Sequence, residues 1–121
     1  MTPKQQILQW VERFNQGDVE ALANMYAQDA VIHQTPIGFI EGRENIRKMF
    51  QDEFNQYDMV CLVDGLFVEY DVCVLEWKDP KGLRGCSIFR FDQGLIRFQR
   101  GYWDMLSFSN QQDISTNQQP I

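Results

Sequence analysis

At 121 residues, with 44% apolar and 23% charged side chains, the chain has the size and composition of one globular domain with a single core. Its net charge of −6 disfavours nucleic acid as a partner, because an acidic surface repels phosphate groups. No apolar run approaches the roughly 20 residues needed to cross a bilayer, and residues 1–6 lack the apolar core of a signal peptide, so we expect no membrane partner.

Two helices are predicted at the start of the chain. Thr2 and Gln5 form a capping-box pattern around a proline that suits the first helical position. Gly17 ends this helix, and Asp18 can cap a second one. The apolar stripe of the first helix is Ile7, Leu8, Val11 and Phe14, with Trp10 at one edge, and the second helix is expected to carry Leu22, Met25 and Tyr26 inward.

A short strand, a loop and a third helix are predicted next. Residues 30–34 are β-like and lead into a loop at residues 37–42, and the helix spans about residues 43–55. The buried stripe of this helix is expected to be Ile46, Met49, Phe50 and Phe54.

From residue 60 onward, the pattern is that of strands joined by tight turns. The expected strands are residues 60–69, 72–78, 82–91 and 95–106. Helices gathered ahead of an antiparallel meander indicate an α+β fold. A strongly curved sheet would wrap the helices into a cone, and the space inside the cone is either core or pocket.

Two further features concern the tail and the cysteines. Residues 109–121 are polar, so we expect a flexible tail after a domain of residues 1–108. Cys61, Cys73 and Cys86 are odd in number and match no zinc spacing. We therefore expect small buried cysteines in a reducing cytoplasm, with no metal and no cofactor.

Five short motifs follow one another at consistent spacing: Phe-Asn-Gln-Gly-Asp at residues 14–18, Asp-Ala-Val-Ile-His at 29–33, Gly-Arg-Glu-Asn-Ile at 42–46, Ser-Ile-Phe-Arg-Phe at 87–91 and Tyr-Trp-Asp at 102–104. Together they resemble the SnoaL-like, polyketide cyclase-like branch of the NTF2-like superfamily, over about residues 4–108. The resemblance implies an NTF2-like cone, in which three N-terminal helices pack on a strongly curved, mostly antiparallel sheet. It implies no single reaction, because this fold hosts many functions.

The ketosteroid isomerases are relatives in this superfamily. Their catalytic tyrosine falls here at Trp10, their strand aspartic acid at Ser87, and their base at or beside Thr35. None of these three side chains can perform that chemistry at neutral pH.

The limonene-epoxide hydrolases are relatives too, and their pattern is also incomplete here. Their later aspartate falls at Gly101, their arginine near Trp77, and their helper residues at Ile32 and Gln34. Only Gln34 keeps the polarity, and the nearby Asp79 has the simpler role of starting a turn.

Two candidate catalytic residues are left. The resemblance to polyketide cyclases implies an acid on the last strand, which is Asp104. Strand alternation puts Gly101 and Trp103 on the opposite face, so Asp104 faces outward if Gly101 lines the pocket, unless a bulge reverses the strand. His33, the only histidine, lies near the expected pocket mouth and suits proton transfer, but it also fits a strand histidine with a satisfied hydrogen bond.

The aromatic residues fit either a ligand pocket or an ordinary core. We expect a pocket for a flat, apolar or oxygenated small molecule, with Gln34 and Ser87 as polar anchors. The expected lining residues are Trp10, Phe14, Tyr26, Ile32, Gln34, Phe50, Trp77, Ser87, Gly101 and Trp103.

Three functions stay open at this stage. A cyclase-, isomerase- or hydrolase-type enzyme requires an ionisable group inside the cone. A non-catalytic carrier or sensor requires a cavity without one, and a protein-interaction module requires a filled cone. For each of them we expect a homodimer through the outer sheet face, which carries Val72, Val74, Glu76, Ile88, Phe98 and Tyr102.

Overall fold

The computed structural model describes residues 1–117, and side chains as far as residue 112. The helices are α1 (Pro3–Gln16), α2 (Val19–Ala23), α3 (Arg43–Gln56) and α4 (Met105–Asn117). The strands are β1 (Tyr26–Gln34), β2 (Gly38–Glu41), β3 (Leu62–Glu69), β4 (Val72–Lys78), β5 (Arg84–Asp92) and β6 (Leu95–Trp103). They form one six-stranded sheet in the order β2-β1-β6-β5-β4-β3. Every neighbouring pair is antiparallel except β1 and β6.

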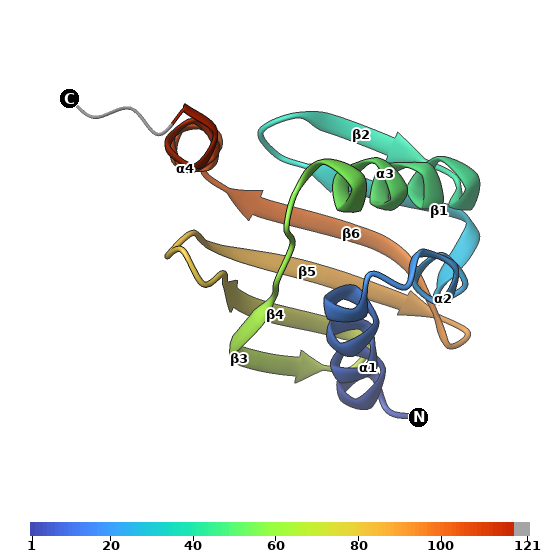
Figure 1. Ribbon diagram of the computed structural model, residues 1–121. Coiled ribbons are helices and arrows are strands. Elements are labelled where there is room, and N and C mark those ends of the chain that lie inside the picture. The colour runs from blue at the N-terminus through green and yellow to red at the C-terminus, as the bar shows by residue number, and fades with distance from the viewer. Residues whose placement is uncertain (118–121) are drawn as a thin grey trace.

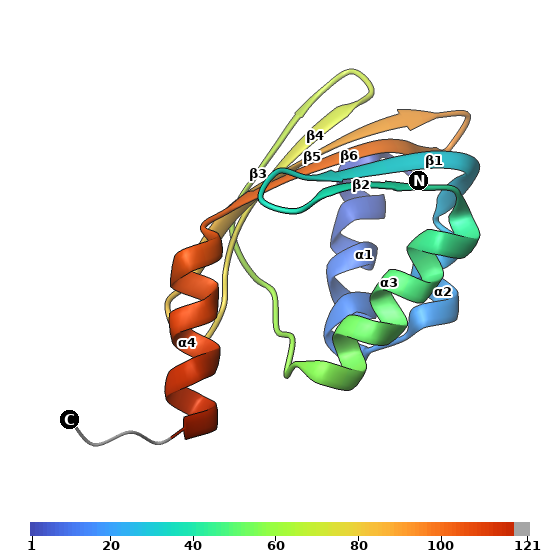
Figure 2. The same cartoon turned by 90° about the horizontal axis from the view of Figure 1, so that it is seen from above.

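The predicted α+β class and curved, mostly antiparallel sheet are confirmed. Helices α1, α2 and α3 lie on one face of the sheet (Figures 1 and 2), and no helix of residues 1–117 covers the other face. Helix α4 leaves the end of β6 on the same side as α1 and α3 (Figure 2). None of the helices in this part of the chain has the length and apolar content that crossing a bilayer requires.

Helix α1 begins and ends as the sequence predicts. The capping box between Thr2 and Gln5 has both of its hydrogen bonds, and Gly17 ends the helix at φ 67°, a conformation that favours glycine. The buried stripe is rotated from the expected one: Trp10 is 5% exposed, whereas Leu8 is 46% exposed. Trp10 therefore lies in the core and Leu8 on the surface.

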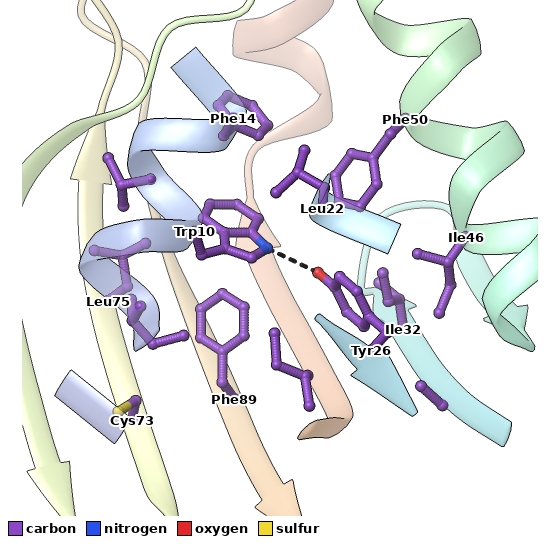
Figure 3. Close-up of a cluster of buried hydrophobic side chains, with 14 of the residues drawn as sticks. Trp10, Phe14, Leu22, Tyr26, Ile32, Ile46, Phe50, Cys73, Leu75 and Phe89 are labelled. Carbon is purple, nitrogen blue, oxygen red and sulfur yellow. Dashed lines mark hydrogen bonds between the residues drawn. The ribbon is translucent and has the colours of Figure 1, made fainter. Parts of the chain in front are cut away.

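The core is an aromatic cluster between α1, α3 and the sheet (Figure 3). The indole of Trp10 packs against Phe14 at 5.1 Å and Phe89 at 5.3 Å between ring centroids. Phe50 of α3 meets Trp10 at 6.3 Å and Tyr26 at 6.1 Å. These rings fill one end of the space between the helices and the sheet.

Three of the differences from the predicted elements have a cause elsewhere in the fold. Tyr26 begins β1 instead of ending the second helix, because its hydroxyl is bonded in the core. Residues 38–41 form β2 instead of a loop, since Ile40 pairs with Ile32 in an antiparallel register. Strand β6 ends at Trp103, not at residue 106, because Asp104 caps α4.

Helix α4 covers part of the sequence that was expected to be a flexible tail. It spans Met105–Asn117, and residues 118–121 lie outside the described residues. Phe108 of α4 packs against Tyr57 at 5.1 Å and Trp103 at 5.5 Å between centroids. The division of the chain at residue 108 stays a prediction.

The cysteines are free thiols in different environments. Cys61 and Cys73 are buried as expected, whereas Cys86 is only half-buried. Burial raises the pKa of the Cys61 thiol to about 12, so this group is neutral near pH 7.

Candidate functional site

A cavity of about 330 Å³ lies between α1, α3, the inner face of the sheet and the first turns of α4. Residues 57–61 and the turn at residues 79–83 complete its wall. The lining residues are Trp10, Phe14, Gln34, Ile37, Phe50, Glu53, Tyr57, Met59, Val60, Cys61, Trp77, Asp79, Leu83, Ser87, Gln99, Trp103, Met105, Phe108 and Ser109. Its volume is at the lower end of the range for small-molecule sites.

Seven of the ten residues expected to line a pocket do line this cavity: Trp10, Phe14, Gln34, Phe50, Trp77, Ser87 and Trp103. Tyr26 and Ile32 lie behind the wall, each 0% exposed. Gly101 is buried behind Gln34, since a Cβ at position 101 would lie 2.8 Å from Gln34 Oε1. The space that glycine leaves there is therefore occupied by the glutamine side chain.

A chain of buried hydrogen bonds fixes the orientation of Gln99. The indole Nε1 of Trp10 donates to the Tyr26 hydroxyl at 3.0 Å (Figure 3), and the Tyr26 hydroxyl donates to Gln99 Oε1. An indole can only donate, so the tyrosine proton must point at an acceptor, which in a glutamine is Oε1. The amide nitrogen of Gln99 is left without a partner among the described residues. None of the described residues has a fully buried side-chain nitrogen without a hydrogen-bond partner. The amide nitrogen of Gln99 is therefore not fully buried, and it reaches the cavity that Gln99 lines.

Gln34 is oriented in the same way. Trp103 Nε1 donates to Gln34 Oε1 at 3.0 Å, which leaves the amide N–H groups of Gln34 for another partner. Strand alternation turns Ile32 and Gln34 toward the inner face of the sheet and His33 toward the outer face. Two glutamine amides, Gln34 held by Trp103 and Gln99 held by Tyr26, thus present donors at the cavity wall.

Glu53 is the acidic residue that α3 brings to the cavity. It is half-buried, and its carboxyl has no hydrogen bond or ion pair with any of the described residues. Burial raises its pKa from the ordinary value of 4.5 to about 7, and the neighbouring Asp52 carboxylate adds to the shift. Glu53 can therefore exchange a proton near neutral pH.

Both catalytic candidates from the sequence lie outside the cavity wall. Asp104 is exposed and caps α4, where its carboxylate accepts from the Ser107 hydroxyl and the Ser107 backbone N–H. These bonds hold the pKa of Asp104 below its ordinary range. His33 lies on the outer sheet face, stacked on Phe39 at 4.1 Å between centroids, and its Nδ1 accepts from Arg100 Nε at 3.1 Å.

Sequence reasoning missed Glu53 and Gln99. A usable signal existed for Glu53, which follows Phe50 by three positions and Met49 by four, and therefore lies on the buried face of its helix. Gln99 shares a strand face with Trp103, but a buried glutamine alone does not indicate its partners. The cavity-facing polar groups come from α3, β1, β5 and β6, which the sequence does not place together.

A second hollow, shallower and of about 470 Å³, lies at the far end of β6. Arg97 binds Asp29 and Asp92 there, each at 3.2 Å, so three of its charged side chains engage one another. The aromatic cavity is more enclosed and holds a carboxyl without a partner among the described residues, so it is the stronger candidate site.

The chain is similar to known proteins both in sequence pattern and in structure. The family model of the SnoaL-like domain matches residues 7–99. An NTF2-like protein of unknown function from Cytophaga hutchinsonii is similar in structure, with a TM-score of 0.79 and 16% identity over 90% of this chain and 96% of that one. The epoxide hydrolase/cyclase-like enzyme SalBIII, described in pyran ring formation in the polyether salinomycin, is similar with a TM-score of 0.76 and 20% identity, over 86% of this chain and 92% of its own. At these identities the two structures support the fold.

Proposed function

The chain belongs to the SnoaL-like domain family, and on that premise we propose that it binds a flat, neutral, oxygenated small molecule in the cavity beside Trp10. The observation that carries this proposal is the pair of glutamine amides that line an aromatic cavity, Gln34 oriented by Trp103 and Gln99 oriented by Tyr26. Amide N–H groups bind acceptor oxygens such as carbonyl or ether oxygens. Aromatic walls favour a flat apolar body between them.

Of the three functions that the sequence left open, the enzyme is favoured. A cyclase-, isomerase- or hydrolase-type reaction needs an ionisable group inside the cone, and Glu53 lines the cavity. SalBIII is described as a cyclase-like enzyme, which supports the same class. The carrier or sensor stays as the second candidate, because the aromatic wall serves binding with or without turnover.

Ligand binding is tested by tryptophan fluorescence, since all three tryptophans of the chain, Trp10, Trp77 and Trp103, line the cavity. We expect 1-tetralone, a flat bicyclic ketone, to change the emission saturably, and tetralin, which lacks the carbonyl, to bind more weakly. Trp103→Ala removes one wall and frees Gln34, so we expect about tenfold weaker tetralone binding, or about 1.4 kcal/mol. Calorimetry checks the affinity independently of emission.

The matched control for this titration is Leu8→Ala, an exposed position on α1 outside the cavity wall. It should leave the tetralone response unchanged. Equal responses to tetralone and tetralin would contradict recognition by amide donors, and no response to either would contradict the proposed binding site.

We also propose that the outer sheet face pairs with a second copy of the chain. A row of cross-strand neighbours runs over all six strands. Its members are Phe67, Val74, Ile88, Arg100, His33 and Phe39. Glu76 and Arg90 flank Val74 and Ile88 on opposite sides along β4 and β5. A two-fold axis that passes through the Val74–Ile88 pair would bring Glu76 of each copy against Arg90 of the other, as an isologous interface requires.

We expect light scattering at micromolar concentration to give twice the mass of one chain. Ile88→Lys places a like charge at the centre of both copies and should give a monomer. Lys48→Glu, on the exposed part of α3, is the control and should stay dimeric. A clean monomer for the unmodified chain would contradict the dimer and leave the ligand proposal intact.

A further inference from the structure

We propose that Glu53 is the proton-transfer residue of the cavity, acting on a carbon acid whose carbonyl oxygen is held by the amide of Gln99. This inference rests on the proposed function, because it assumes that the cavity takes an oxygenated ligand. It assigns to α3 an acid-base role that neither Asp104 nor His33 can fill from outside the cavity wall.

The first argument is the direction in which Glu53 faces. Its polar neighbours on α3, namely Gln51, Asp52, Asn55 and Gln56, are all exposed. Glu53 instead lines the cavity beside Phe50, one turn earlier on the same helix face. A carboxyl turned toward an aromatic wall gains nothing structural when no donor binds it, and none of the described residues does.

The second argument is the electrostatic setting of Glu53. Apart from Glu53, the ionisable side chains at the cavity wall are Tyr57, Cys61 and Asp79. Asp79 is engaged in its turn, where its carboxylate accepts from the backbone N–H groups of Lys81 and Leu83 at 2.9 Å each. Cys61 is a neutral thiol near pH 7 because burial raises its pKa to about 12. Among the residues that the structure describes, no cationic side chain lines the cavity, so the Glu53 carboxylate is available as a base.

Behind the wall, Tyr26 responds to the same carboxylate. Burial raises the pKa of the Tyr26 phenol well above its ordinary value, and the charge of Glu53 adds to this effect. Tyr26 therefore stays protonated and keeps donating to Gln99 Oε1. The base on α3 and the donor on β6 are thus maintained at the same pH.

The third argument is the oxygen site that shares the cavity with this base. Gln99 keeps its N–H groups toward the cavity because Tyr26 occupies its Oε1. Ser87, on the adjacent strand β5, also lines the cavity, and its hydroxyl has no hydrogen-bond partner among the described residues. Fixed donors of this kind stabilise the negative charge that develops on a carbonyl oxygen when a neighbouring carbon loses its proton.

The proposed step balances without an oxidant or a further reactant. The C–H bond next to the carbonyl breaks, the proton goes to a Glu53 carboxylate oxygen, and the electron pair moves onto the carbonyl oxygen, which accepts from Gln99. Protonated Glu53 then returns the proton, either to another carbon of the enolate, which is an isomerisation, or to the alkoxide formed when the enolate carbon attacks a second carbonyl, which closes a ring. A substrate with two carbonyl groups or a shifted double bond fits this chemistry.

The test uses 5-nitrobenzisoxazole, a flat neutral probe that needs only a base. When its C–H proton is removed, the N–O bond breaks and a coloured nitrophenolate forms. We expect the protein to accelerate this reaction with a rate that rises through an apparent pKa of about 7, as for Glu53. Glu53→Gln should lower the rate at least about 100-fold, the lower end for general-base catalysis, and Glu53→Asp should restore part of it.

The matched control is Asp52→Asn, the exposed carboxyl next to Glu53, which should keep the plateau rate. A rate and pH profile unchanged in Glu53→Gln, or a wild-type rate no higher than that of acetate at equal concentration, would overturn the inference. Tetralone binding separates this result from the proposed function: Glu53→Gln should still bind the neutral ketone. If it binds and the acid-base role has failed, the carrier function takes the place of the enzyme.

Discussion

Tyr26→Phe is expected to lower the free energy of unfolding by about 2–4 kcal/mol, because it removes one hydroxyl and leaves two buried groups unpaired. Trp10 Nε1 loses its acceptor, and Gln99 Oε1 loses its donor. Trp10 and Gln99 are each 5% exposed, so neither group is reached freely by bulk water. For a domain of this size the melting temperature should fall by roughly 10 °C, and urea titration should show a lower midpoint with an unchanged slope.

The matched control is Tyr70→Phe, since Tyr70 is 89% exposed and its hydroxyl has no partner among the described residues. This change should stay within about 0.5 kcal/mol of wild type. A Tyr26→Phe protein as stable as the control would mean that the hydroxyl does not join Trp10 to Gln99 in solution. The variant should also bind tetralone more weakly, because the Gln99 amide is then free to turn.

The helices and strands could be predicted largely from local patterns. Neighbouring residues determine the capping box at Thr2 and the glycine that ends α1, and both are present in the structure. Strand alternation likewise places Gln99 and Trp103 on the same face of β6, and both line the cavity. The errors at Tyr26 and at β2 are tertiary. Tyr26 enters a strand because its partners lie at positions 10 and 99, and residues 38–41 form a strand only because β1 offers them an edge.

The candidate site was predictable only in part, for the same reason. Aromatic lining residues such as Trp10 and Trp77 follow from apolar spacing, but the partners of Gln34 and Gln99 are set by contacts 69 and 73 residues apart in sequence. Asp104 was expected as an acid because the resemblance to polyketide cyclases implies one on the last strand. Its actual role, capping α4, depends on a helix that the polar sequence after Phe108 does not predict.

The hydrogen bonds that hold Gln34 and Gln99 have a common physical consequence. A free glutamine can present either its oxygen or its nitrogen to a ligand, so it discriminates poorly between donors and acceptors. Because Trp103 occupies Oε1 of Gln34 and Tyr26 occupies Oε1 of Gln99, both glutamines present donors. These donors suit the acceptor oxygen of the proposed ligand, and among the described residues Glu53 contributes the one unengaged carboxyl of the cavity.

Glu53 should also make the stability of the fold depend on pH. Its pKa is 4.5 in its ordinary environment and about 7 in the folded protein, so between these values the folded state binds more protons than the unfolded state. The contribution of Glu53 to the free energy of unfolding is therefore fully present below about pH 4.5, is lost as the pH rises toward 7, and stays lost above it. A difference of about 2.5 pKa units corresponds to at most about 3.4 kcal/mol, and water in the cavity reduces this figure.

Glu53→Gln has no such proton to lose, so its stability advantage over wild type should be near zero at pH 4.5 and should grow to about 1–3 kcal/mol at pH 8. Urea midpoints measured for both proteins at each pH and at one protein concentration give this difference directly, and titrations elsewhere in the chain cancel. Glu69→Gln, an exposed position on β3, changes the net charge equally and should show no such growth. A gap between Glu53→Gln and wild type that stays constant from pH 4.5 to 8 would mean that the carboxyl is well solvated in the folded protein, and the acid-base role of Glu53 would lose its physical basis. A gap that grows between about pH 4.5 and 7 and levels off above pH 7 would tie the stability of the fold to the same proton that the cavity is proposed to transfer.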